Sequence, residues 1–158
     1  MTTSTIRVTF ERLRSTGLAA ADATRGCTKE EIAEIESTLR VRLPNAYREF
    51  LRLCGKQAGE FLLGTDWTFP TILALKESAA ALLRECDVPR ELSPSAFVFA
   101  MHQGYQFLFF DCQSGQDPAV FRFIEGDQSA RQVFDSFSNW FRQCAEDEIA
   151  AQAELNER

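Results

Sequence analysis

Catalytic signatures are scarce in this 158-residue chain, which has one histidine and eight scattered glycines. Without a second histidine, neither a His-paired metal site nor a His-Glu-x-x-His helix can form. Gly-x-Ser-x-Gly is absent, which excludes a nucleophile elbow, and neither glycine-rich nucleotide-binding motif occurs. One nucleophile–base pair stays open, His102 with Cys112, although a turn histidine at a strand end is the simpler interpretation. We therefore expect no enzyme, no metal site and no cofactor.

Membrane-spanning and secretory segments are also missing. No apolar run approaches the roughly 20 residues that a membrane helix needs, and the N-terminus lacks a charged region followed by an apolar run. The cysteines are odd in number and too widely spaced for a disulfide framework or a zinc knuckle; they are Cys27, Cys54, Cys86, Cys112 and Cys144. We therefore expect a cytoplasmic protein without membrane contact, whose cysteines are small core residues.

Size and composition are those of a single globular domain. Hydrophobic residues make up 45% of the chain and charged residues 25%, both typical values. A chain of this length can bury an adequate core without disulfides or a structural metal ion. We expect a core over about residues 28–144, preceded by an N-terminal helix and connection over 1–27. Residues 145–158 are expected to form a helical or frayed tail.

Negative charge is concentrated in the second half of the chain. The net charge of −6 divides into about +2 over residues 1–84 and about −8 over residues 85–158. An acidic half does not bind nucleic acid by neutralising phosphates. It could steer a basic protein partner toward the molecule, or it could simply keep the protein soluble. The sequence leaves both uses open.

Residues 28–54 have the pattern of two amphipathic helices joined at Leu43-Pro44. Thr28 with Glu31 forms a capping-box pattern, and Pro44 suits the start of a helix because it has no backbone N–H to donate. Gly55 can end the second helix in the left-handed conformation. The apolar residues at helical spacing are Ile32, Ile35 and Leu39 in the first helix, and Tyr47, Phe50, Leu51 and Cys54 in the second.

A two-residue period replaces the helical one after residue 96. Three Phe-x-Phe pairs occur at Phe97–Phe99, Phe107–Phe109 and Phe121–Phe123, and each pair is expected on one face of its strand. Turn residues separate the runs, which predicts an antiparallel meander with one face against a core. Two short aromatic runs, over residues 60–63 and 66–69, suggest one or two further strands.

Helical spacing also occurs in three other segments, over residues 5–14, 75–86 and 130–146. The last has a wide apolar face that includes Val133 and Phe134. Helices are thus segregated from a sequential sheet, which favours an α+β fold. We predict an N-terminal helix pair and a C-terminal helix packed on a mainly antiparallel sheet.

Several of these segments resemble the SUKH superfamily. The stretch E-I-A-E-I-E-S-T-L-R-V-R-L-P-N-A-Y-R-E-F-L is similar to its N-terminal signature, and F-V-F-A-M-H-Q-G-Y-Q-F-L-F-F-D is similar to its central strand pair, with Gly104 in the turn and Asp111 at the end. P-A-V-F-R-F and V-F-D-S-F-S-N-W-F resemble the next strand and the terminal helix. The family often has an acidic or small polar residue beside the turn glycine, where this chain has Tyr105. The residues that carry the N-terminal match are Glu36, Leu39, Leu43, Pro44, Tyr47, Phe50 and Leu51.

The resemblance implies a non-catalytic protein that binds another protein. Bacterial members of the superfamily are immunity proteins that neutralise polymorphic or contact-dependent toxins, often nucleases, and fungal members are regulators and scaffolds. A short single-domain chain fits the immunity type, so we expect a toxin domain as the partner, occluded at its active site. The alternative is a regulatory or scaffold protein with a non-toxin partner. The sequence does not give the oligomeric state.

Candidate partner-binding residues are turn and strand-end side chains of the predicted sheet. Carboxylates in such places could mimic the phosphates that a nuclease expects, although turns also favour aspartate for local backbone reasons. Trp67 could anchor an interface or pack against the helix pair, and Tyr105 carries the same two alternatives. The full set is Asp66, Trp67, His102, Tyr105, Asp111, Asp117, Glu125 and Asp127.

Overall fold

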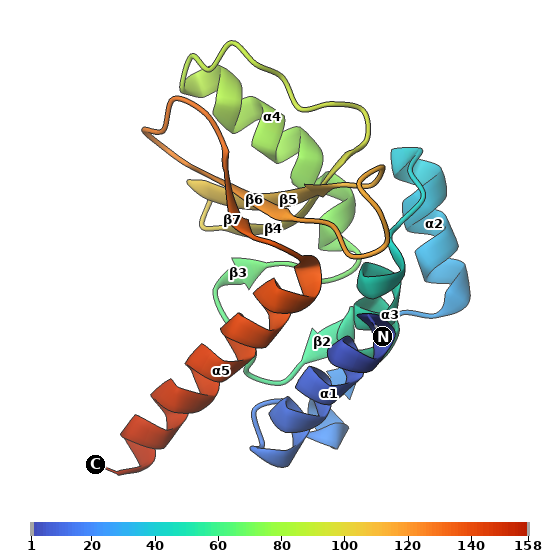
Figure 1. Cartoon of the computed structure of the whole chain (residues 1–158), viewed down its shortest axis with the longest axis vertical. Coiled ribbons are helices and arrows are strands. Elements are labelled where there is room, and N and C mark those ends of the chain that lie inside the picture. The colour runs from blue at the N-terminus through green and yellow to red at the C-terminus, as the bar shows by residue number, and fades with distance from the viewer. Residues whose placement is uncertain (1, 158) are drawn as a thin grey trace.

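The computed structural model describes residues 2–157 and confirms an α+β fold (Figure 1). Within these residues the helices are α1 (Thr2–Ser15), α2 (Lys29–Leu39), α3 (Asn45–Cys54), α4 (Leu75–Glu85) and α5 (Phe137–Asn156), with 3-10 turns η1 (Ala21–Ala23) and η2 (Thr71–Ala74). The strands are β1 (Thr24–Arg25), β2 (Gln57–Ala58), β3 (Thr65–Asp66), β4 (Ala96–His102), β5 (Gln106–Asp111), β6 (Val120–Ile124) and β7 (Arg131–Phe134).

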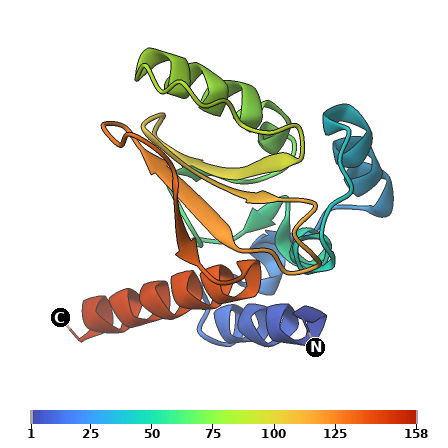
Figure 2. The same cartoon turned by 45° about the horizontal axis from the view of Figure 1, so that its top comes forward.

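The main sheet is antiparallel, five-stranded and sequential, in the order β3-β4-β5-β6-β7. Figure 2 shows α4 on one side of this sheet and α1 and α5 on the other, while α2 lies at one end. The strands β1 and β2 form a separate antiparallel pair. The helix α1 packs against both α3 and α5, so the first and last helices lie side by side below the sheet in Figure 2.

Both faces of the sheet are covered, whereas the sequence predicted a core on one face only. Phe97 and Phe99 point toward α3, where their rings lie 5.1 and 6.2 Å from that of Tyr47. Phe107 and Phe109 occupy the opposite face and contact the phenylalanines of β6. The prediction was wrong because α4 returns over this second face, where it packs on β4.

The predicted helix over residues 130–146 is wrong at its start. Residues 131–134 instead form the edge strand β7, paired with β6. The helix α5 begins after Ser136, whose side-chain oxygen accepts a hydrogen bond from the Asn139 N–H at 3.1 Å and so satisfies one of the free N–H groups at the helix start. Val133 and Phe134 matched a helical spacing with the residues after them, but Ser136 separates the two elements.

Of the one or two short strands expected over residues 60–63 and 66–69, one is present. Residues 60–63 form turns, and Leu62 there has a left-handed backbone with φ 53°. Only Thr65–Asp66 pairs with the sheet, opposite His102 and Met101 of β4. The aromatic residues that suggested strands here instead fill the core between α3 and α5.

The residues of the signature around Leu43-Pro44 hold the link between α2 and α3 in place. The capping box at the start of α2 is present, with Thr28 and Glu31 each accepting from the other's backbone N–H. At the other end, a carboxylate oxygen of Glu36 accepts from the Leu43 N–H at 2.7 Å and from the Arg48 guanidinium at 2.6 Å. The half-buried Glu36 therefore holds α2 and α3 at a fixed angle. This part of the signature stabilises the fold.

Position 55, directly after α3, requires glycine for a different reason from the one predicted. Its backbone is right-handed, with φ −62°, so no left-handed turn requires glycine here. A Cβ atom at Gly55 would instead lie 2.7 Å from the Cys27 sulfur and 2.8 Å from a Leu51 methyl group. Close packing between the chain before α2 and the end of α3 therefore excludes a side chain.

Tyr47 occupies the centre of the aromatic core. Its ring lies 5.1–5.3 Å from those of Phe97, Phe110 and Phe137. Its hydroxyl is fully buried, and no group among the described residues forms a hydrogen bond with it. Burial also raises the pKa of this phenol well above its usual value, which keeps the hydroxyl neutral.

Replacing Tyr47 with phenylalanine is expected to stabilise the protein. The variant keeps the ring packing and removes a hydroxyl whose unpaired burial costs about 1–3 kcal/mol. We expect the free energy of unfolding to rise by about 1 kcal/mol, measured from the urea midpoint at constant slope. A loss of stability instead would mean that the hydroxyl has a hydrogen-bond partner.

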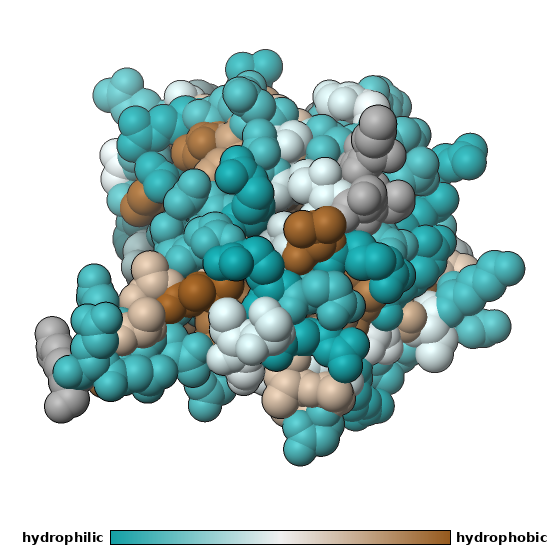
Figure 3. Space-filling view, turned by 60° about the horizontal axis from the view of Figure 1, so that its bottom comes forward, coloured by the Kyte–Doolittle hydropathy of each residue, from teal (hydrophilic) through white to brown (hydrophobic). Residues whose placement is uncertain are grey.

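The side of the molecule that carries α1 and α5 is mostly hydrophilic (Figure 3), with hydrophobic residues in small separate patches. An exposed ion pair joins the two helices, because Arg12 donates to both carboxylate oxygens of Glu146 at 2.7 and 3.0 Å. No helix within residues 2–157 is both long enough and apolar enough to span a membrane.

Candidate functional site

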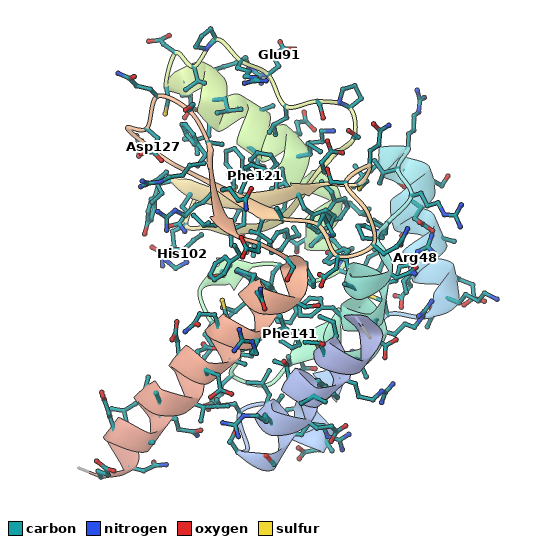
Figure 4. The ribbon with its side chains drawn as sticks, in the orientation of Figure 1. Arg48, Glu91, His102, Phe121, Asp127 and Phe141 are labelled. Carbon is teal, nitrogen blue, oxygen red and sulfur yellow. The ribbon has the colours of Figure 1, made fainter. Side chains whose placement is uncertain are left out.

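Five of the eight sequence-predicted site residues lie at one end of the sheet. The β4–β5 hairpin brings His102 and Tyr105 to this end, and the Glu125 N–H donates to the Tyr105 carbonyl at 2.8 Å. The β6–β7 turn therefore lies against the hairpin, with Glu125 and Asp127 in it. Asp66 is on β3 and pairs with Met101, the residue before His102. Figure 4 shows His102 and Asp127 on the same side of the sheet. We call this surface the hairpin end.

Asp111 and Asp117 lie at the opposite end of the sheet. The antiparallel register pairs Asp111 with the first residue of β4, far along the strand from His102. Both carboxylates accept backbone hydrogen bonds, Asp111 from the Gln113 N–H at 2.8 Å within its own turn and Asp117 from the Ser138 N–H of α5 at 2.9 Å. These two aspartates therefore stabilise a turn and the start of α5, and the five carboxylates of the predicted set do not form one acidic surface.

Of its two possible uses, Trp67 packs in the core and does not lie at the surface. Its side chain is only 4% exposed, and its ring contacts those of Phe50 and Phe61 at 5.4 and 5.9 Å. Tyr105 differs, because 39% of it is exposed at the tip of the hairpin. Of the two aromatic candidates, only Tyr105 is available at the surface.

His102 is held by its neighbours and has no nucleophile beside it. Its Nδ1 lies 2.9 Å from the Thr65 hydroxyl, and its ring meets that of Tyr105 edge to face at 5.6 Å. Cys112 follows β5 at the other end of the sheet, which excludes the His102–Cys112 pair considered from the sequence. Burial raises the pKa of the Cys112 thiol to about 11, so this cysteine is also a poor nucleophile at neutral pH.

A pocket of about 370 Å³ opens beside the hairpin end, between the sheet and α5. Its apolar wall consists of Leu62, Ala100, Leu108, Val133, Phe134 and Trp140, and its polar lining of Thr65, His102, Tyr105, Gln106 and Arg122. The strand β7 forms one side of the pocket. Because the sequence predicted that segment as helix, the pocket could not be inferred from the sequence. The signal that could have found it is Arg122, a charged residue between two strand phenylalanines.

Leu62 of the pocket lining is hydrogen-bonded to a half-buried carboxylate of α5, that of Glu148. The Leu62 N–H donates to both oxygens of Glu148, at 3.0 and 3.2 Å. Burial raises the pKa of Glu148 above its usual value, although the Leu62 hydrogen bond opposes that shift. Burial also raises the pKa of the Cys144 thiol, to about 12. The arrangement ties the 60–65 turn to α5 and keeps one wall of the pocket in place.

The part of the chain that the structure describes contains no group of three or more His, Cys, Asp or Glu side chains that could hold a metal ion. All five cysteines are free thiols. Comparison with curated proteins gives no match.

Comparison with known protein families gives one assignment for the region that carries this site. The profile of the SMI1 / KNR4 family (SUKH-1) matches residues 26–143, which include the sheet, the helix pair and the start of α5. This family comprises immunity proteins and Smi1/Knr4-like regulators, which are generally non-catalytic and act by binding other proteins. With about three quarters of its length matched, the chain belongs to the SMI1 / KNR4 (SUKH-1) family.

Proposed function

We propose that this protein is an immunity protein that binds a cognate toxin domain and occludes its active site. The observation that carries the proposal is the hairpin end of a protein from a binding family: the exposed Tyr105 lines a pocket there, and the neighbouring turn carries an unpaired carboxylate. Exposed aromatic residues are frequent anchors of protein interfaces.

The geometry favours a preformed binding surface. Tyr105 and His102 belong to a tight hairpin of the sheet, and the Glu125 backbone is hydrogen-bonded to that hairpin. Little conformational freedom would be lost on binding, which lowers the cost of association. An occluding protein gains from such rigidity, because it covers a toxin's groove without first rearranging.

Fewer carboxylates are available for binding a partner than the sequence suggested. The side chain of Glu125 is exposed, and its carboxylate has no hydrogen-bond or ion-pair partner among the described residues, whereas Asp127 accepts from the Ile124 N–H at 3.0 Å within its own turn. Glu125 is therefore the carboxylate best placed to meet a basic residue of a nuclease groove, with Asp127 in the same turn and Asp66 three strands away on β3.

The first test is capture of the partner followed by a growth assay. The tagged protein is purified from its own host, and the domain that co-purifies in stoichiometric amount is expressed alone in a sensitive strain. We expect that domain to arrest growth, and co-expression of this protein to restore it. A partner that is harmless alone would refute the immunity role. Deleting the gene by itself distinguishes the regulator alternative, since a regulator gives a phenotype without any toxin.

Variants at the hairpin end then test the surface. Tyr105→Ala combined with Glu125→Lys is expected to weaken partner binding by at least about 100-fold, because an interface anchor and a charge pair are lost together. The control for the charge reversal is Glu91→Lys, an exposed acid in the loop after α4 on the other side of the sheet (Figure 4). If Glu125→Lys alone weakened binding no more than Glu91→Lys does, only the net charge would matter.

A further inference from the structure

Arg122 is a cation without a counter-ion in the pocket beside the hairpin end. It lies on β6 opposite Leu108 of β5 and lines the pocket. Its Nε is buried and has no hydrogen-bond partner, and no carboxylate among the described residues pairs with its guanidinium. A buried, unpaired donor of a charged group is costly, so its presence requires an explanation.

A second arginine lies next to it. Arg131 of β7 is the direct cross-strand partner of Arg122, and side chains opposite one another in an antiparallel pair lie on the same face. Like charges in this arrangement repel and destabilise the pairing. Arg131 also lacks an ion-pair partner among the described residues. Two unpaired arginines therefore lie side by side in the half of the chain that has a net charge of about −8.

An anion bound to the guanidinium of Arg122 in the pocket would offset its charge and the repulsion between the two arginines. The guanidinium fork matches a carboxylate or a phosphate with two parallel hydrogen bonds. The remaining lining decides between them, because Leu108, Val133, Phe134 and Trp140 form an apolar wall that a hydrated phosphate could not use. The volume of about 370 Å³ is at the lower end of the range for ligand pockets. It has room for one aromatic or branched aliphatic group with its carboxylate.

We infer that this pocket binds a hydrophobic carboxylate, with the anionic group on Arg122 and the apolar group against Trp140 and Phe134. The same chemistry is presented by a small free acid and by the C-terminal residue of a polypeptide. This inference goes beyond the proposed immunity function and does not depend on the partner being a toxin.

The test is an NMR titration of the intact protein with matched probes. The acids are 3-phenylpropionate and N-acetyl-L-phenylalanine, each compared with its own neutral amide, and inorganic phosphate is the third probe. The indole N–H signal of Trp140 reports the pocket, and that of Trp67, which is buried elsewhere, is the internal reference. We expect at least one acid to bind about 10-fold or more tightly than its amide, as charge-assisted hydrogen bonds require, and phosphate to bind more weakly.

Variants of Arg122 link that preference to the pocket. Arg122→Gln is expected to reduce binding of the acid to that of its amide. Arg122→Lys keeps the positive charge and the aliphatic stem, so it should fold even if Arg122→Gln does not. It should lose most of the preference for the acid over the amide, because lysine lacks the planar guanidinium that forms two parallel hydrogen bonds. Arg90→Gln, in an exposed loop after α4, is the control and should change nothing.

The two acids distinguish the sources of the ligand. Tighter binding of N-acetyl-L-phenylalanine indicates the C-terminal residue of a polypeptide, and tighter binding of 3-phenylpropionate indicates a small free acid. The inference is overturned if neither acid shifts the Trp140 signal, if acids and amides bind equally, if phosphate binds as tightly as the acids, or if Arg122→Lys and Arg122→Gln both bind like wild type.

Discussion

Replacing Phe137 with alanine should lower the free energy of unfolding by about 3–5 kcal/mol, as expected when a fully buried aromatic ring is removed from a packed core. Phe137 is the first residue of α5 and is completely buried. Its ring lies within 5.8 Å of five others, those of Tyr47, Phe50, Phe99, Phe110 and Trp140. The side chain therefore joins α3, the sheet and α5, and its loss leaves a cavity where the three meet.

Phe121→Ala is the matched control for that substitution. Phe121 is on the other face of the sheet, is partly exposed and stacks on Phe109 at 5.4 Å, so we expect a loss of only about 1–2 kcal/mol. Urea denaturation of the two variants measures both values. Equal losses would contradict the view that the main core lies between the sheet and the helices α3 and α5.

Gly26→Ala is expected to cost about 3 kcal/mol or more, although it adds a single methyl group. A Cβ atom at Gly26 would lie 1.7 Å from the carbonyl oxygen of Arg52 near the end of α3, which no real structure tolerates. The chain cannot simply move away, since the Cys27 N–H donates to the Leu51 carbonyl at 2.8 Å and the Arg25 carbonyl accepts from Lys56 at 3.0 Å. Relief of the clash requires these hydrogen bonds to break.

Gly115→Ala separates this steric effect from the general cost of losing a glycine. Gly115 has φ +93° and nothing within 4 Å of the position that a Cβ would take, so its cost is backbone strain alone, about 1–2 kcal/mol. Thermal unfolding midpoints of the two variants give the comparison. If Gly26→Ala were no less stable than Gly115→Ala, the close approach of residue 26 to α3 would be wrong.

Elements with their own start signals could be predicted from the sequence. The helix pair over 28–54 was predicted because the Thr28 capping box and Pro44 mark helix starts locally, and both helices are present. The strands β4, β5 and β6 were predicted because paired phenylalanines alternate with other residues. In each case the information lies within a few neighbouring residues.

Features that depend on distant contacts could not be predicted. Val133 and Phe134 match a helical spacing with later residues, and only pairing with β6 makes them a strand. The second covered face depends on where α4 packs, and the reason for Gly55 depends on Cys27 and Leu51 of other segments. No local pattern contains these facts.

The candidate site divides in the same way. Turn residues were predicted at strand ends, but only the register shows that Glu125 and Asp127 lie with Tyr105, and that Asp111 and Asp117 lie at the opposite end. The pocket combines residues from the turn before β3, all five strands of the main sheet and α5. Arg122 acquires its significance from that assembly, because a lone arginine in a strand indicates little by itself.

Amide hydrogen exchange of this protein, with and without its captured partner, tests the central claim most directly. The claim is that binding occurs through the hairpin end of the sheet. We expect the partner to slow exchange in the turns over residues 102–106 and 125–130, while exchange in the loop over residues 86–95 stays the same. Slowed exchange in the 86–95 loop, with the two turns unchanged, would contradict the claim.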